Sequence, residues 1–271
     1  MHPALRLGPV RLTVTNLDRS VGFYQDAIGL RQHARDGDVA AMGAGGEDLL
    51  VLHEAPFAKP AGRHAGLYHV ALLHPSREEL ARALVRLANA RIFVEGASDH
   101  GISEAIYLPD PDGNGLELAA DRPREQWPED WGTLRPEPLD MHELIRLVAS
   151  EPPSRHADPA LKIGHLHLHV GDIELGLAFY RDVLGFELQA LLPSAAFVSA
   201  GGYHHHLGFN VWRGPGVGPA PPGTVGLREW TVVLPEDALA QALARLDAAD
   251  VPRDGALTLD PWGNALRLVA A

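Results

Sequence analysis

The stretch Tyr-Leu-Pro-Asp-Pro-Asp-Gly-Asn-Gly-Leu-Glu-Leu, residues 107–118, predicts a tight turn that leads into a short strand. Gly-Asn-Gly at 113–115 adopts positive φ angles at little cost, so the chain can reverse there. The alternation in Leu-Glu-Leu at 116–118 then places Glu117 on the face opposite to its leucine neighbours. An acid on the concave face of a sheet is either a solvated residue or a ligand, and the rest of the chain has to decide between them.

The same turn recurs near the end of the chain. Asp-Pro-x-Gly-Asn stands at 110–114 and again at 260–264, an offset of 150 residues. In the second copy Arg267 takes the place of Glu117. At an offset of 160 residues the beginnings of the two units also match: Gly66, Leu67 and Pro75 with Gly226, Leu227 and Pro235. A helical pattern of leucines follows each beginning.

A second kind of unit precedes each of these. Phe-Tyr-x-Asp-x-x-Gly occurs at 23–29 and at 179–185, an offset of 156 residues, and Ala-Gly-Gly repeats at 44–46 and 200–202. The chain therefore contains four modules in the order A, B, A, B. Each module predicts one strand, one helix and three further strands. The expected fold class is α+β, built from four βαβββ modules whose sheets leave a concave face for a ligand.

Composition limits the classes of function. The 271 residues are 46% hydrophobic and include no cysteine, which excludes disulfides, thiolate zinc sites and cysteine nucleophiles. The net charge of −12 disfavours nucleic-acid and anionic-membrane partners. No signal peptide or membrane span is apparent, so we expect a cytoplasmic protein. The 15 histidines favour metal binding or acid-base chemistry.

The domain organisation follows from the repeats. We expect one domain at 5–121, from the first and second modules, and another at 161–271, from the third and fourth. The linker at 122–160 is rich in proline and has few apolar residues outside Met141 to Val148. Asp140 and Glu143 have capping-box spacing, which predicts one docked helix in the linker.

On these motifs the chain resembles the vicinal oxygen chelate superfamily, which includes glyoxalases, bleomycin-resistance proteins and extradiol dioxygenases. The resemblance rests on the repeated Phe-Tyr-x-Asp-x-x-Gly blocks and the two Asp-Pro-x-Gly-Asn turns. Within the superfamily it is most similar to two-domain catechol 2,3-dioxygenases of the Bacillus type. The narrower match rests on residues 201–206 and on the Asp-Arg-Pro corner at 121–123.

The resemblance implies positions for metal ligands. Metal-binding members take ligands from the first and last strands of paired modules. The first-strand positions here hold Pro9, His69, His165 and Glu229, and the last-strand positions of the B modules hold Glu117 and Arg267. One combination provides two histidines and a carboxylate: His69, Glu117 and His165. Such a set is associated with non-haem Fe(II) oxygenases, because it leaves three adjacent positions open for two catechol oxygens and O₂.

This ligand set also predicts how the modules pair. If modules paired in sequence order, His69 and Glu117 would share one cleft and His165 would lie in another. The complete triad therefore predicts that the second and third modules pair, and that the first and fourth form a degenerate cleft with Glu229 and Arg267.

The resemblance implies further groups around the ion. His205, expected within a strand from His205 to Val211, would move protons. His100 and Tyr107 would hydrogen-bond the substrate oxygen. Strand alternation predicts that His204 and His206 point away from His205, so they receive no chemical role.

Three functions remain open at this point. The leading one is Fe(II)-dependent extradiol cleavage of a catechol with O₂, giving a 2-hydroxymuconic semialdehyde type of product, with Mn(II) as the alternative ion. A glyoxalase-type lyase or isomerase normally needs a further carboxylate ligand, and residues 203–206 contain no acid. A metal-free antibiotic-binding protein would be expected to lose the ligand positions. Exposed sheet edges favour a homo-oligomer.

Overall fold

The computed structural model describes residues 1–128 and 135–271, which form two mixed sheets of nine strands each. All four predicted modules are present as a strand, a helical segment and three strands, which confirms the α+β class. The first module contains β2 (Val10–Val14), α1 (Leu17–Phe23), η1 (Tyr24–Ile28), β3 (Arg31–Asp36), β4 (Val39–Gly43) and β5 (Asp48–Glu54). The second contains β6 (Gly66–His74), α2 (Arg77–Asn89), β7 (Gly96–Asp99), β8 (Ser103–Pro109) and β9 (Gly115–Asp121).

The other two modules repeat this order. The third contains β11 (Lys162–His169), α4 (Ile173–Leu177), η4 (Ala178–Val183), β12 (Glu187–Leu192), β13 (Ala195–Ser199) and β14 (Leu207–Asn210). The fourth contains β15 (Gly226–Leu234), α5 (Glu236–Ala248), β16 (Arg253–Asp254), β17 (Leu257–Leu259) and β18 (Ala265–Ala270). A short strand, β1 (Arg6–Leu7), precedes the first module and pairs with β15.

The linker contains the predicted helix, α3 (Met141–Arg146), and the Asp140 carboxylate caps it by accepting a hydrogen bond from the Glu143 backbone N–H at 2.9 Å. Among the described residues the linker also contributes a short 3₁₀ helix, η2 (Arg124–Gln126), and β10 (Glu137–Pro138), which pairs with β7. No helix in the described part of the chain has both the length and the apolar composition needed to cross a bilayer.

Strand order confirms the predicted pairing of modules. One sheet has the order β10-β7-β8-β9-β6-β11-β14-β13-β12, so the second and third modules share it. The other has the order β16-β17-β18-β15-β2-β5-β4-β3, from the fourth and first modules. Each sheet therefore takes strands from both sides of the linker, and the domain limits 5–121 and 161–271 remain predictions from sequence. Antiparallel pairing of β6 with β11 joins the two halves of the first of these sheets.

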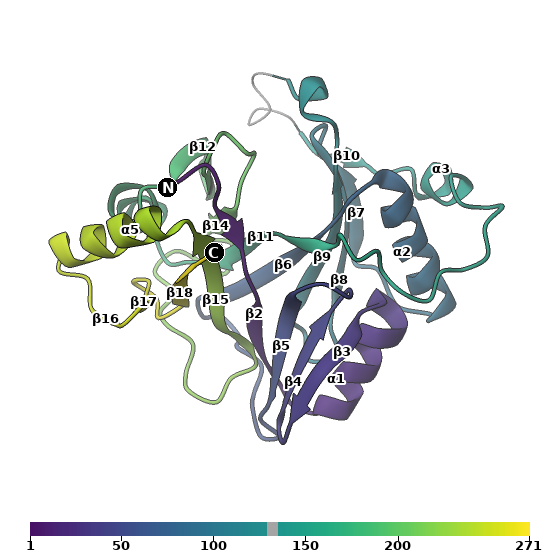
Figure 1. Ribbon diagram of the computed structural model, residues 1–271, viewed down its shortest axis with the longest axis horizontal. Coiled ribbons are helices and arrows are strands. Elements are labelled where there is room, and N and C mark those ends of the chain that lie inside the picture. Colours follow the sequence, from purple (N-terminus) through teal and green to yellow (C-terminus); the bar gives the residue numbers. More distant parts are fainter. Residues whose placement is uncertain (129–134) are drawn as a thin grey trace.

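The repeated turns tie together modules that are neighbours in sequence. Asp110 accepts hydrogen bonds from two backbone N–H groups of its own turn, at 2.8 Å each, and from the Tyr24 hydroxyl at 3.1 Å. In the second copy, Tyr180 donates to Asp260 at 2.6 Å. Gly113 has a φ of +85°, as the turn requires. In Figure 1, α1 and α2 accordingly lie together on one side of the molecule, with α5 on the opposite side.

One predicted strand begins later than expected. The strand predicted from His205 begins at Leu207, because Gly201 and Gly202 have φ angles of +63° and +67° and form a loop that continues to residue 206. The three histidines at 204–206 therefore lie outside the strand, and the alternation used to orient their side chains does not apply.

One buried histidine makes stability depend on pH. His74 ends β6, is 2% exposed, and finds no hydrogen-bond partner for either ring nitrogen among the described residues. Burial, together with the nearby Arg86 guanidinium, lowers the pKa of His74 to about 3. In the unfolded chain the imidazole returns to a pKa of about 6.5. The stability linked to neutral His74 is therefore present above pH 6.5 and is lost as the pH falls toward 3.

We expect His74→Leu to weaken the pH dependence of stability. Between pH 7 and pH 5 the native protein should lose about 2 kcal/mol of unfolding free energy through this histidine, and the variant should retain that amount. Urea unfolding followed at both pH values checks the difference. Equal losses in the two proteins would contradict the assignment.

Candidate metal centre

Three side chains from three neighbouring strands converge on one point of the sheet that the second and third modules share. Glu117 Oε2, from β9, lies 3.0 Å from His69 Nε2, on β6, and 3.2 Å from His165 Nε2, on β11. The two histidine nitrogens are 3.3 Å apart. The structure thus brings together all three residues for which the sequence predicted a metal role.

Strand register explains the convergence. Ala71 of β6 is the pairing partner both of Glu117, on the parallel strand β9, and of His165, on the antiparallel strand β11. These three residues form one row across the sheet, and His69 lies two residues along β6 on the same face. Ala71 is fully buried, and its methyl group leaves room for the three longer side chains above it. Sequence reasoning missed Ala71, because only the register identifies its position.

The group combines a buried carboxylate with two buried imidazoles. Glu117 is 3% exposed, and burial acts to raise its pKa, but the influence of His165 and His69 outweighs burial and holds the pKa of the carboxyl well below its usual range. Burial lowers the pKa of His69 in spite of Glu117. A buried negative charge beside a neutral imidazole is costly unless a cation accompanies it.

The donor atoms fit a single ion. Donors that bind one ion at about 2.0–2.2 Å lie roughly 2.8–3.6 Å apart, for angles between right and tetrahedral. All three separations fall within this range. Within the described part of the chain, His69, Glu117 and His165 each offer one potential ligand atom, and these three atoms lie within 4.8 Å of one another. Two imidazoles and one carboxylate suit a divalent transition metal such as iron, manganese or zinc.

The triad lies at the base of a cleft of about 460 Å³. This volume is in the range of small-molecule sites. The walls are aromatic and apolar on the side of the third module and carry hydroxyl groups on the side of the second. Besides the triad they are formed by Tyr68, Ser98, His100, Ile102, Ser103, Tyr107, Pro136, His167, Ala190, Leu192, Phe197, His205 and Trp212.

All three residues for which an acid-base role was predicted line this cleft. The ring centroid of His205 is 4.1 Å from that of His165. His100 Nε2 lies 2.8 Å from the Tyr107 hydroxyl, so these two form a pair on the side of β8. Burial, reinforced by Glu117, raises the pKa of Tyr107, so its hydroxyl retains its proton.

Strand alternation predicted that His204 points away from His205, and this prediction is wrong. Its Nδ1 lies 2.7 Å from His205 Nδ1, and its Nε2 lies 3.1 Å from Asp121 Oδ1. The reason is the loop at 201–206, in which successive side chains do not alternate. The Gly-Gly pair at 201–202 was the available signal for this loop. Asp121 was missed as well, although its spacing of four from Glu117 on β9 places both carboxylates on one face.

His167 and His169 both contact the side-chain amide of Asn210. His167 lines the cleft, and its Nε2 lies 2.9 Å from Asn210 Nδ2. The other amide atom, Asn210 Oδ1, lies 2.8 Å from His169 Nδ1. The backbone N–H of Trp212 also donates to Asn210 Oδ1 at 3.0 Å, which fixes the orientation of the amide. These residues hold the aromatic wall of the cleft in place.

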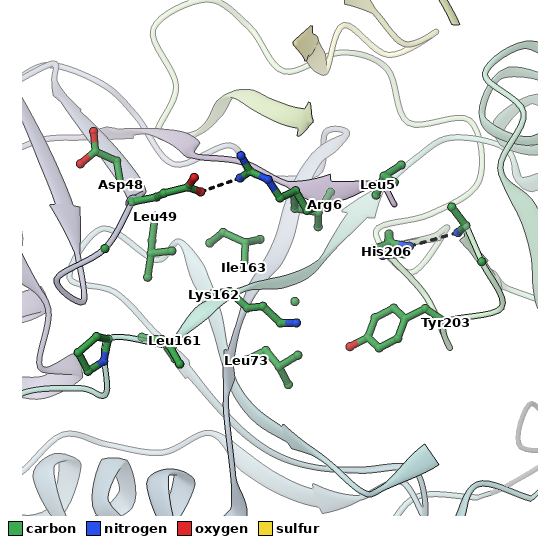
Figure 2. A pocket seen from close by; sticks show the side chains of 18 of the residues that line it. Leu5, Arg6, Asp48, Leu49, Leu73, Leu161, Lys162, Ile163, Tyr203 and His206 are labelled. Atoms are coloured by element: carbon green, nitrogen blue, oxygen red, sulfur yellow. Dashed lines mark hydrogen bonds and ion pairs between the residues drawn. The ribbon is translucent and has the colours of Figure 1, made fainter. Parts of the chain in front are cut away.

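Two further hollows contrast with the cleft. Figure 2 shows one of about 510 Å³ between Leu5, Leu73 and Ile163, with Tyr203 and His206 at one side; none of the triad lines it. The other is the degenerate cleft of the second sheet. There Arg267 donates to both oxygens of Glu229 at 2.7 Å, so the carboxylate already has its counter-charge.

Comparison with known proteins agrees with the fold. The family model described as the Glyoxalase/Bleomycin resistance protein/Dioxygenase superfamily matches residues 6–118 and 162–267. A catechol-2,3-dioxygenase of Bacillus subtilis (strain 168) is 42% identical over 243 residues, which cover 87% of this chain and 85% of that protein.

Solved structures show the same fold at low sequence identity. A putative dioxygenase from Bacillus subtilis superposes with a TM-score of 0.68 at 12% identity, covering 100% of this chain and 86% of that one. Glyoxalase I from Zea mays superposes with a TM-score of 0.60 at 16% identity, covering 98% and 92%. At these identities the likeness concerns the fold alone.

Proposed function

This chain belongs to the Glyoxalase/Bleomycin resistance protein/Dioxygenase superfamily, and we propose that within it the protein is an extradiol dioxygenase. It would cleave a catechol-type aromatic diol next to its two hydroxyl groups, using O₂ and Fe(II), with Mn(II) as the alternative ion. The product would be of the 2-hydroxymuconic semialdehyde type, which contains both atoms of O₂. We propose a cytoplasmic location for this activity.

The observation that supports this proposal most is the convergence of His69, Glu117 and His165 from three strands within 4.8 Å. When bound to these residues, Fe(II) would supply the redox chemistry that a catechol needs in order to react with O₂. The similarity to a catechol-2,3-dioxygenase at 42% identity over most of both chains points to the same reaction.

The residues of the chain would contribute binding and proton transfer. Phe197 and Trp212 provide an apolar wall against which an aromatic ring can pack while water is excluded. On one side, His205 would accept a proton from a catechol hydroxyl. On the other, the Tyr107 hydroxyl, paired with His100 at 2.8 Å, would donate a hydrogen bond to the second catechol oxygen.

The glyoxalase-type alternative receives less support from the site. Within the described residues the group of potential ligands contains one carboxylate, and the loop at 201–206 brings His205 rather than an acid to the cleft. A metal-free binding protein would have no need of a buried, ionised Glu117. An assay for isomerisation of a thiohemiacetal, alongside the catechol assay, separates the two enzyme proposals.

We expect Glu117→Gln to abolish retention of the metal, because a neutral amide removes the negative charge that holds the ion. The matched control is Glu229→Gln, which removes the carboxylate of the degenerate cleft and should bind metal normally. Both proteins are loaded anaerobically with Fe(II), desalted and analysed for iron by mass spectrometry. Iron in Glu117→Gln at the level of the parent protein would refute the triad.

We expect His205→Phe to retain iron and to lose about 10²- to 10⁴-fold in turnover of catechol, because the phenyl ring fills the space of the imidazole but accepts no proton. Formation of the yellow ring-cleavage product under air measures turnover, and iron content is determined on the same sample. Turnover within a factor of three of the parent protein would exclude His205 as the base.

A further inference from the structure

A chain of hydrogen-bonding groups leads away from the cleft behind His205. Asp121, at the end of β9, has one carboxylate oxygen 3.1 Å from His204 Nε2, and its other oxygen accepts a hydrogen bond from the Tyr203 hydroxyl at 2.8 Å. His204 Nδ1 lies 2.7 Å from His205 Nδ1. The chain Asp121, His204, His205 therefore ends at the cleft.

The chemistry of these groups sets the direction of the hydrogen bonds. An ionised carboxylate only accepts, so His204 Nε2 has to donate to Asp121. A neutral imidazole that donates through Nε2 has an acceptor lone pair on Nδ1. The contact between the two Nδ1 atoms is then a hydrogen bond in which His205 donates and His204 accepts.

Burial supports the neutral form of His204. Its ring is 1% exposed and packs against Tyr203 and Trp127, whose ring centroids are 4.0 Å and 5.1 Å away. Burial lowers the pKa of His204, and the opposing effect of Asp121 does not offset it.

We propose that Asp121 and His204 are positioning residues that hold His205 as the Nδ1–H tautomer, with the lone pair of its Nε2 facing the cleft. No described residue hydrogen-bonds His205 Nε2, and His205 lines the cleft. The catalytic role of this tautomer rests on the proposed function. The tautomer itself is set by the protein and can be measured without substrate.

The consequence for catalysis follows from the balance of one proton. The O–H bond of a catechol hydroxyl breaks, an N–H bond forms at His205 Nε2, and the electron pair remains on the catechol oxygen. In the other tautomer, Nε2 already has a hydrogen and cannot accept one. The imidazolium that forms keeps its Nδ1–H bonded to His204, whose own N–H faces the Asp121 carboxylate, so the new positive charge is stabilised by a nearby negative one.

The direct test is nuclear magnetic resonance of ¹⁵N-histidine-labelled protein loaded with diamagnetic Zn(II). Two-bond ¹H–¹⁵N correlations distinguish the Nδ1–H from the Nε2–H tautomer of each ring. We expect His205 to show the Nδ1–H pattern in the parent protein. In Asp121→Leu and His204→Leu we expect the Nε2–H pattern or a mixture. His204→Asn should restore the Nδ1–H pattern in part, because its amide oxygen replaces the acceptor at Nδ1.

The matched control is His206→Asn, at the third histidine of the same run. His206 Nδ1 accepts a hydrogen bond from the Ala200 backbone N–H at 3.2 Å, outside the chain to Asp121, and faces the hollow in Figure 2. An asparagine oxygen can accept the same bond. This variant should leave the tautomer of His205 and the turnover of catechol unchanged.

Kinetics of the Fe(II)-loaded proteins supply a second measurement. The two leucine variants should lose about 10- to 100-fold in kcat with little change in KM or iron content. An Nε2–H tautomer of His205 in the parent protein, or an Nδ1–H tautomer that persists in both leucine variants, would overturn the proposal. If the parent protein turns over no catechol, the proposed function fails, and the resonance measurement still decides the positioning of His205.

Discussion

The antiparallel pairing of β6 with β11 is the constraint on which the site depends. It joins the second and third modules across the linker and places His165 beside the strand that contains His69. Glu117 reaches the same point because β9 runs parallel to β6 on its other side. If each module had paired within its own half of the chain, the two histidines would lie in different sheets and neither cleft would contain three ligands.

Charge explains why one cleft is a candidate metal centre and its counterpart is not. In the second sheet Glu229 is neutralised by Arg267 through two hydrogen bonds of 2.7 Å, so that cleft is complete without an ion. In the first, the described ion-pair partners of Glu117 are the imidazoles of His69 and His165, and Glu117 is 3% exposed. The same fold, repeated in one chain, thus provides its own comparison: a guanidinium supplies the counter-charge in one sheet, and a metal ion would supply it in the other.

Much of this arrangement could be predicted from the sequence because it is repeated there. The constant offsets identified four modules. The ligand positions implied by the family resemblance, placed on these modules, predicted His69, Glu117 and His165 and the pairing of modules that their convergence requires. The order of the modules and the linker suggest two separate halves of the chain. The triad instead predicted that a sheet combines strands from both halves, as the structure shows.

The rest depended on geometry that a linear pattern does not contain. His204 was oriented wrongly because alternation holds only within a strand, and the Gly-Gly pair at 201–202 turns the chain before β14 begins. Asp121 and Ala71 have ordinary local sequences, and their roles follow from the side chains that register and loop closure bring to them. The turn at 110–114 is structural in both copies, as the hydrogen bonds from Tyr24 and Tyr180 show.

We expect one ion to bind where the second and third modules meet. Anomalous X-ray diffraction at the iron edge, on crystals of protein loaded anaerobically with Fe(II), tests this most directly. A single anomalous peak within bonding distance of His69, Glu117 and His165 is the predicted result. A peak at the Glu229 cleft, or no ordered iron at either place, would refute metal binding by these three residues.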